Sequence, residues 1–175
     1  GNVELDTHAD TCVLGKNFII LHLTGRECDV SPYTDSYESI SGVPIVSGAT
    51  AWTCQQTYET FILVVHEALW MPDQVASTLV NPNQMRAYGT VVRDNPFDGR
   101  IFIEDVDNEL TIPMAVDGTN IFFETRTPTQ DELDNCRHVQ LNSQKEWDPA
   151  NMHVPKISSI ENTPVEIEER DDEIY

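Results

Sequence analysis

The segment ELDTHADTCVLG, residues 4–15, gathers several chemically active side chains within one short stretch. Its two aspartates are Asp6 and Asp10, with Thr7 and His8 between them. Two carboxylates about 3 Å apart share one proton, because both cannot stay ionised at that distance, and such a pair can direct water at a peptide bond. One carboxylate takes the proton of the water and the other donates to the carbonyl oxygen. A chain this short supplies one such residue, Asp6, so this chemistry requires a two-fold dimer.

A metal site is the alternative chemistry for the same segment. Asp6, His8, Asp10 and Cys12 alternate along the chain, and on a regular strand they would share one face. Ligands at this spacing along one strand lie about 6 to 7 Å apart, so at most two of them reach one ion. We therefore predict no metal, and the absence of phosphate-loop and dinucleotide motifs predicts no cofactor.

The elements that must position this segment are mostly strands. Apolar and β-branched runs predict strands at 18–23, 43–52, 60–71, 90–92, 100–105, 109–116 and 120–126. Asp117 and Gly118 are typical of a hairpin turn between the last two. Helices are predicted at 81–88, with Asn81 as N-cap and Pro82 in the first position, and at 128–137. The fold is therefore predicted to be mainly β with one or two short helices.

Composition narrows the partners. The 175 residues carry 30 acidic and 10 basic side chains, a net charge of −20, which repels nucleic acid and anionic lipid. No apolar run approaches the roughly 20 residues of a membrane span. We therefore predict neither nucleic acid nor membrane as a partner. The cysteines have no C-x-x-C pair and are free thiols if the chain is cytosolic, or two disulfides if it is secreted. They are Cys12, Cys28, Cys54 and Cys136.

Two further groups of residues can be interpreted from their surroundings. From about residue 148 prolines and acidic residues dominate, and such a segment buries too little apolar surface to offset backbone ordering of about 1 to 2 kcal/mol per residue. Four aromatic residues are predicted to pack in the core or on hairpins: Trp52, Tyr58, Trp70 and Trp147. For Trp52, a role in the substrate groove is the alternative.

Three stretches resemble one family. LDTHADTCVL resembles the Asp-Thr/Ser-Gly-Ala segment of retroviral-type aspartic proteases, the retropepsins, and residues 68–92 resemble copia-type LTR retrotransposon polyproteins. In the protease fold the apolar pair corresponding to Leu79 and Val80 lies in the strand beneath the catalytic loop. Residues 112–133, continuing to 146–149, are similar to the region after the protease in divergent elements of this kind. The positions that match the first motif are Asp6, Thr7, Ala9, Asp10, Val13 and Leu14.

The resemblance implies a retropepsin-like closed β-barrel with a short helix, followed by a C-terminal β-hairpin region and an acidic tail. The corresponding domains are 1–97 for the protease, 98–147 for a hairpin and short-helix extension, and 148–175 for the tail. It also implies a homodimer that cleaves a retroelement polyprotein, with a second copy and a peptide or polyprotein as partners. The implied location is a cytoplasmic virus-like particle, and an extracellular assembly stays open.

The resemblance also assigns roles to single residues. Asp6 is the expected catalytic carboxylate, and Thr7 is expected to brace the two loops across the dimer axis. A glycine-bearing hairpin at 41–49 is the expected flap. The substrate-binding positions are then expected to be His8, Ala9, Asp10, Gly42 and Gly48.

Departures from the family pattern support a second hypothesis. His8 replaces a glycine whose missing side chain gives the substrate room, and Asn81 stands where glycine usually follows the apolar pair. Only five residues precede Asp6, fewer than the strand that normally comes before the site. The alternative is therefore a catalytically inactive retropepsin-like fold that serves as a structural subunit of a filament or particle.

Overall fold

The computed structural model describes residues 1–31 and 39–152, and this part of the chain is mainly β, which confirms the predicted class. The predicted acidic tail, beyond residue 152, lies outside the described residues. The strands are β1 (Asn2–Leu5), β2 (Val13–Leu14), β3 (Ile19–Val30), β4 (Ile40–Thr53), β5 (Thr60–Trp70), β6 (Thr78–Val80), β7 (Val91–Arg93), β8 (Phe102–Asp105), β9 (Leu110–Pro113), β10 (Ala115–Asp117), β11 (Asn120–Glu124) and β12 (Arg137–Gln140). The helices are α1 (Pro82–Arg86) and α2 (Gln130–Asn135), with short 3-10 turns η1 (Pro96–Asp98) and η2 (Pro149–Asn151).

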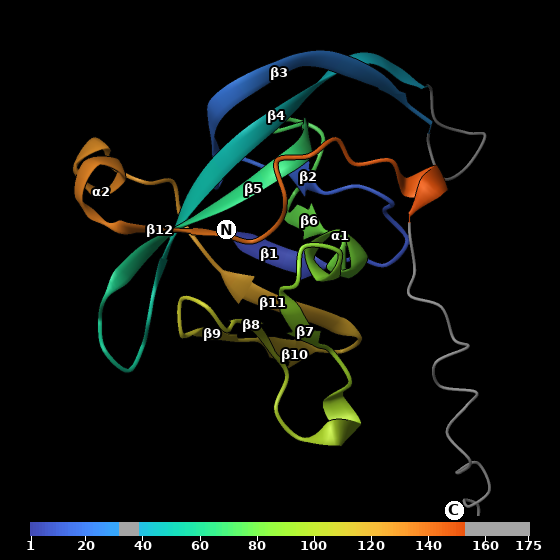
Figure 1. Ribbon diagram of the computed structural model, residues 1–175. Coiled ribbons are helices and arrows are strands. Elements are labelled where there is room, and N and C mark those ends of the chain that lie inside the picture. The colour runs from blue at the N-terminus through green and yellow to red at the C-terminus, as the bar shows by residue number, and fades with distance from the viewer. Residues whose placement is uncertain (32–38, 153–175) are drawn as a thin grey trace, which may run out of the picture.

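Nine of these strands form one sheet, in the order β10-β11-β1-β6-β2-β5-β4-β3, with β12 as a further partner of β5. A second sheet contains β7, β8 and β9. The long β3 and β4 arch over one side of the molecule, and strands β8 to β11 lie on the other (Figure 1). Within the described residues the hydrogen-bonded path runs open from β10 to β3, so the expected closed barrel is not found as such.

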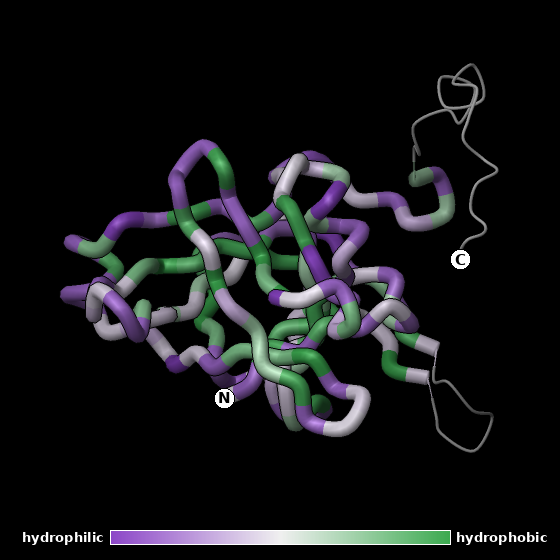
Figure 2. Tube along the Cα trace, turned by 90° about the horizontal axis from the view of Figure 1, so that it is seen from below, coloured by the Kyte–Doolittle hydropathy of each residue, from purple (hydrophilic) through white to green (hydrophobic). Residues whose placement is uncertain are grey.

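Strand β5 forms the centre of the large sheet. Nine consecutive residues, 61–69, are buried, which explains why its sequence is an almost unbroken apolar run. It pairs with β4 on one side and with β2 and β12 on the other. Figure 2 shows hydrophobic segments running mainly through the middle of the molecule, while many projecting loops are hydrophilic.

The short strand β6 lies between β1 and β2. It runs parallel to β1, with Leu5 opposite Val80, and antiparallel to β2, with Val13 opposite Leu79. Strands β1 and β2, which flank the loop of residues 6–12, therefore both pair with β6. The expectation that Leu79 and Val80 belong to a strand beside this loop is confirmed.

The outer side of β1 is covered by β11, which pairs with it antiparallel. Val3 lies opposite Phe123, and both side chains are buried. The terminal amino group of Gly1 donates a hydrogen bond to the carbonyl oxygen of Thr125, at 2.6 Å. Strand β11 of the extension thus lies beside β1, so β10, β11 and β12 belong to the same sheet as strands of residues 1–97.

The short elements follow the sequence signals closely. The side chain of Asn81 caps α1, whose first residue is Pro82, and Gly118 has a φ of 65° in the turn between β10 and β11. Both predicted helical windows contain the helices that form. The prediction of a single strand at 109–116 was wrong, because the chain changes sheets at Met114, whose N–H bonds to Ile101 O at 3.1 Å.

The aromatic predictions were partly right. Trp52 is buried and stacks on Phe61, with ring centroids 5.9 Å apart. Tyr58 is instead 81% exposed, because it occupies a tight turn with a φ of 61°. In the part of the chain that the structure describes, no helix is long and apolar enough to cross a bilayer.

Candidate functional site

The candidate site is the loop of residues 6–12, which begins where β1 ends. The N–H of Asp6 bonds to Val80 O at 3.0 Å, so the backbone of the first loop residue is held by β6. The Asp6 side chain turns back over its own loop, where Oδ1 accepts hydrogen bonds from the N–H groups of His8 at 2.9 Å and Ala9 at 3.4 Å. Aspartate commonly stabilises a turn in this way. The carboxylate is therefore oriented before any second chain or substrate arrives.

Two buried amide side chains of the α1 region hold this loop from below. Asn81 Oδ1 accepts from Asn83 N and Gln84 N and so caps the helix, while Asn81 Nδ2 donates to Ala9 O. Gln84 Oε1 accepts from Cys12 N at 2.9 Å, and Gln84 Nε2 donates to Glu67 O at 2.9 Å. Since these amides are nearly inaccessible to water, the loss of any of these hydrogen bonds lowers the free energy of unfolding.

The remaining residues of the predicted site lie along the loop surface. Thr7, His8 and Asp10 are exposed, and Ala9 is half-buried. The hydroxyl of Thr11 donates to Asp10 Oδ1 at 3.2 Å. Because the tip of the loop faces outward, a second copy of the chain has access to Thr7 and to the Asp6 turn.

The two predicted flap glycines have a different setting from the one expected. Residues 41–49 form no hairpin of their own but one continuous strand, so that prediction was wrong. Gly48 is buried, and a side chain there would collide with Leu14, so close packing rather than substrate contact explains this glycine. Gly42 lies near the far end of the β3–β4 hairpin, exposed and with a φ of 70°.

A cavity of about 450 Å³ lies between this hairpin and the loop. Asp10 and Thr11 border it from the loop, and Cys28 to Ser31 and Ile45 border it from the hairpin. Glu67 and Leu69 of β5 complete it on one side, and Trp147 and Pro149 on another. This volume falls in the range of about 300 to 1,000 Å³ that is usual for ligand sites.

Sequence reasoning did not assign a site role to Glu67 or Trp147. Trp147 Nε1 donates to Asp10 O at 2.8 Å, and Trp147 N donates to Glu67 Oε1 at 2.9 Å. In the sequence, the segment EWDP at 146–149 carries a family resemblance and no chemical motif. No local sequence pattern predicts these two contacts, because the partners are separated by 137 positions in one case and by 80 in the other.

Two cysteines near the site have raised pKa values. Complete burial raises the pKa of Cys12 to about 12, outweighing the hydrogen bond that Asn81 N donates to its sulfur. Burial also raises the pKa of Cys28, and the negative charges of Asp10 and Asp29 add to this effect. All four cysteines are free thiols. Within residues 1–31 and 39–152, no three histidine, cysteine or acidic side chains converge as a metal site would require.

A serine and a histidine also meet, in the core behind the loop. Ser47 Oγ lies 2.7 Å from His66 Nδ1, and His66 Nε2 contacts Gln140 Oε1. Because an amide oxygen only accepts, His66 Nε2 is the donor in the second contact. Ser47 is 7% and His66 4% exposed, so this chain of hydrogen bonds holds β4, β5 and β12 together and offers no access to a substrate.

Comparisons with known protein families, with curated proteins and with solved structures found no match to this chain. The sequence motif and the geometry of the loop are therefore the grounds on which a function can be proposed.

Proposed function

We propose that the chain is a retropepsin-like aspartic endopeptidase that acts as a homodimer on a polyprotein. The observation that carries this proposal is the turn at Asp6, where two backbone N–H groups orient the carboxylate on an exposed loop. A preorganised carboxylate does not have to be repositioned during the reaction. The support from β6 and α1 beneath the loop adds to the proposal, since both are where the family resemblance expects them.

The proposed mechanism requires two copies of the loop. Asp6 of one copy takes a proton from water, while Asp6 of the other donates a proton to the carbonyl oxygen of the peptide. The exposed Thr7 braces the two loops at their contact. A peptide binds in extended form beside the loop, under the β3–β4 hairpin. The closed retropepsin-like barrel and the location in a cytoplasmic retroelement particle belong to the same proposal.

The substitution Asp6→Asn tests the proposal, because asparagine keeps the turn but cannot exchange the proton. We expect cleavage of a peptide library to disappear, while the exposed Asp98→Asn serves as a matched control and retains full activity. The measurement is peptide cleavage at mildly acidic pH, followed by mass spectrometry, with a statine-type inhibitor as a second probe. Cleavage that survives Asp6→Asn would contradict the proposal.

A mixing experiment tests the need for two copies. Dimers that contain one Asp6→Asn chain lack a carboxylate, so an equal mixture with wild-type chain should retain about one quarter of the activity after subunit exchange. Activity that falls only to one half would show that each chain works alone.

The edge strand β3 favours a structural role as the second candidate. Among the described strands it pairs with β4 only, and it exposes Leu21 and Leu23 by 43% and 59%. An open edge with apolar side chains promotes strand pairing between molecules. Filaments in electron micrographs that disappear on Leu23→Lys, together with absent proteolysis, would favour this candidate over the enzyme.

A further inference from the structure

The segment that follows β12, residues 141–152 and here called the strap, is tied to β5. Leu141 N donates to Val64 O at 2.9 Å and so extends the pairing of β12 with β5. Asn142 then makes two hydrogen bonds with the backbone of His66, accepting from its N–H at 2.7 Å and donating to its carbonyl at 2.8 Å. The strap therefore starts from a fixed point in the core.

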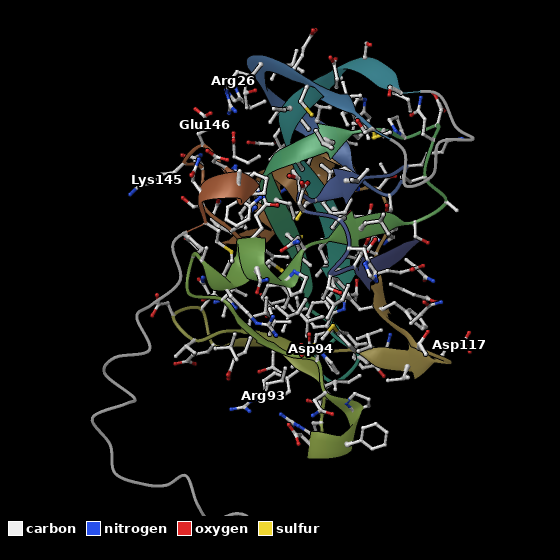
Figure 3. The ribbon with its side chains drawn as sticks, turned by 90° about the vertical axis from the view of Figure 1, so that its right-hand side faces the viewer. Arg26, Arg93, Asp94, Asp117, Lys145 and Glu146 are labelled. Atoms are coloured by element: carbon white, nitrogen blue, oxygen red, sulfur yellow. The ribbon has the colours of Figure 1, made fainter. Side chains whose placement is uncertain are left out.

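Glu67 connects the strap to the β3–β4 hairpin. An extra residue in β5 opposite Ser47 forms a bulge, in which Glu67 has a φ of 52°, and such bulges redirect side chains. The Glu67 carboxylate contacts the Arg26 guanidinium of β3 and also accepts from Trp147 N. The pKa of Arg26 is raised by this hydrogen bond and, to a smaller extent, by Glu146. Figure 3 shows Arg26 and Glu146 on the same side of the molecule.

Trp147 borders the 450 Å³ cavity and does not fill it. Its indole N–H is used by Asp10 O, and its backbone N–H by Glu67, so both of its donors fix it in place. A smaller cavity, of about 190 Å³, lies against α1 and is also bordered by Trp147. Trp147 thus lines both cavities.

The surface of the larger cavity combines apolar and acidic groups. Val30, Ile45 and Leu69 supply aliphatic surface. Asp10 and Asp29 supply carboxylates, of which Asp29 Oδ1 accepts from Gly42 N at 3.1 Å. No lysine or arginine is among the described residues that line this cavity. A lysine or arginine side chain fits such walls, because its stem packs on apolar surface while its charge stays near carboxylates.

We propose that this cavity is a subsite for a lysine or arginine side chain of the peptide, with Trp147 as its specificity-determining residue. The inference rests on the proposed endopeptidase function, and it adds the substrate class and a residue beyond the 1–97 domain. The strap contributes Trp147 to the lining of the subsite, and the loop contributes Asp10. The β3–β4 hairpin borders the cavity on another side.

Protection of Cys28 tests the subsite without any cleavage. The full chain carrying Asp6→Asn is treated with N-ethylmaleimide, and the alkylation rates of Cys28, in the cavity, and Cys54, at the opposite end of β4, are followed by peptide mapping. Three matched extended peptides carry lysine, norleucine or glutamate at every second position. We expect the lysine peptide to protect Cys28 at about fivefold lower concentration than the norleucine peptide, the ratio of a partly exposed ion pair. Cys54 should react equally throughout.

Variants at Trp147 test whether this side chain determines the preference for lysine. Trp147→Phe keeps the ring and should retain the preference for lysine, whereas Trp147→Ala should remove it while the Cys54 rate stays constant. Equal protection by all three peptides overturns the cationic preference, and an unchanged preference in Trp147→Ala overturns the role of that residue. If no peptide protects Cys28 although the wild-type chain cleaves peptides, the subsite is wrong and the endopeptidase stands. Protection of Cys28 by the lysine peptide without cleavage by the wild-type chain supports the cationic subsite and overturns the endopeptidase.

Discussion

The two α-helices are nearly equal in length and both begin at a side-chain cap, yet they have different roles. In α1, Asn81 caps the helix and Gln84 and Met85 are buried beneath the candidate catalytic loop. In α2, Thr129 and Glu132 form a complete capping box, but no residue of the helix is buried. The cap thus determines where each helix starts. The buried polar side chains of α1, in contrast, determine that this helix supports the loop. On this basis α1 belongs to the site and α2 to the surface.

Replacing the buried glutamine of α1 should give the largest difference in stability loss between the two helices. Gln84→Met leaves Cys12 N–H and the Glu67 carbonyl without partners in the interior, so we expect a loss of about 2 to 4 kcal/mol in unfolding free energy. Gln130→Met in α2 is the matched control, since the Gln130 side chain donates to the exposed Asp134, and should change stability by less than about 0.5 kcal/mol. Urea denaturation measures both, and equal losses would remove the distinction between the helices.

The N-caps should differ by a smaller amount. Asn81→Ala removes the cap and the bond to Ala9 O, for an expected loss of about 2 kcal/mol, whereas Thr129→Ala should lose about 1 kcal/mol. Asn81→Ser keeps a capping oxygen but loses the amide donor, so it should restore the cap contribution alone. Denaturation midpoints of the three variants give the comparison, and full recovery by Asn81→Ser would show that the bond to Ala9 contributes nothing.

The smallest effect should come from Glu132, and it depends on pH. Hydrogen bonds from the Arg126 side chain and then from Thr129 N lower the pKa of Glu132 to about 2, from the ordinary 4.5. Because the folded state favours the ionised form, the contribution is present above pH 4.5 and is lost as the pH falls towards 2. We expect Glu132→Gln to cost about 0.5 kcal/mol at pH 7 and to flatten the decline in stability between these pH values, measured by thermal unfolding.

Local signals in the sequence predicted much of the fold. Asn81 and Pro82 marked α1, the pair Asp117 and Gly118 marked a turn, and the apolar run of β5 marked the central strand. Each of these signals depends on neighbouring residues, so it can be recognised without knowing the rest of the structure. The position of Leu79 and Val80 beside the loop came instead from the family resemblance.

The missed features depend on residues far apart in the chain. The pairing of β12 with β5, the contact of Trp147 with Asp10 and the bulge at Glu67 have no local signature. The glycine at position 48 was interpreted as a flap residue, although it is small because Leu14 packs against it. The same residue type serves a turn, a flap or a close contact, and only tertiary packing distinguishes them.

The pairing of β1 with β11 also bears on the order in which the chain folds. Strand β1 has two neighbours, and they come from residues 78–80 and 120–124. Pairings this distant in sequence close large loops, which slows folding. Strand β1 therefore acquires its outer neighbour only after the β10–β11 hairpin has left the ribosome, whereas β6, which holds the backbone of Asp6, is synthesised about 40 residues earlier.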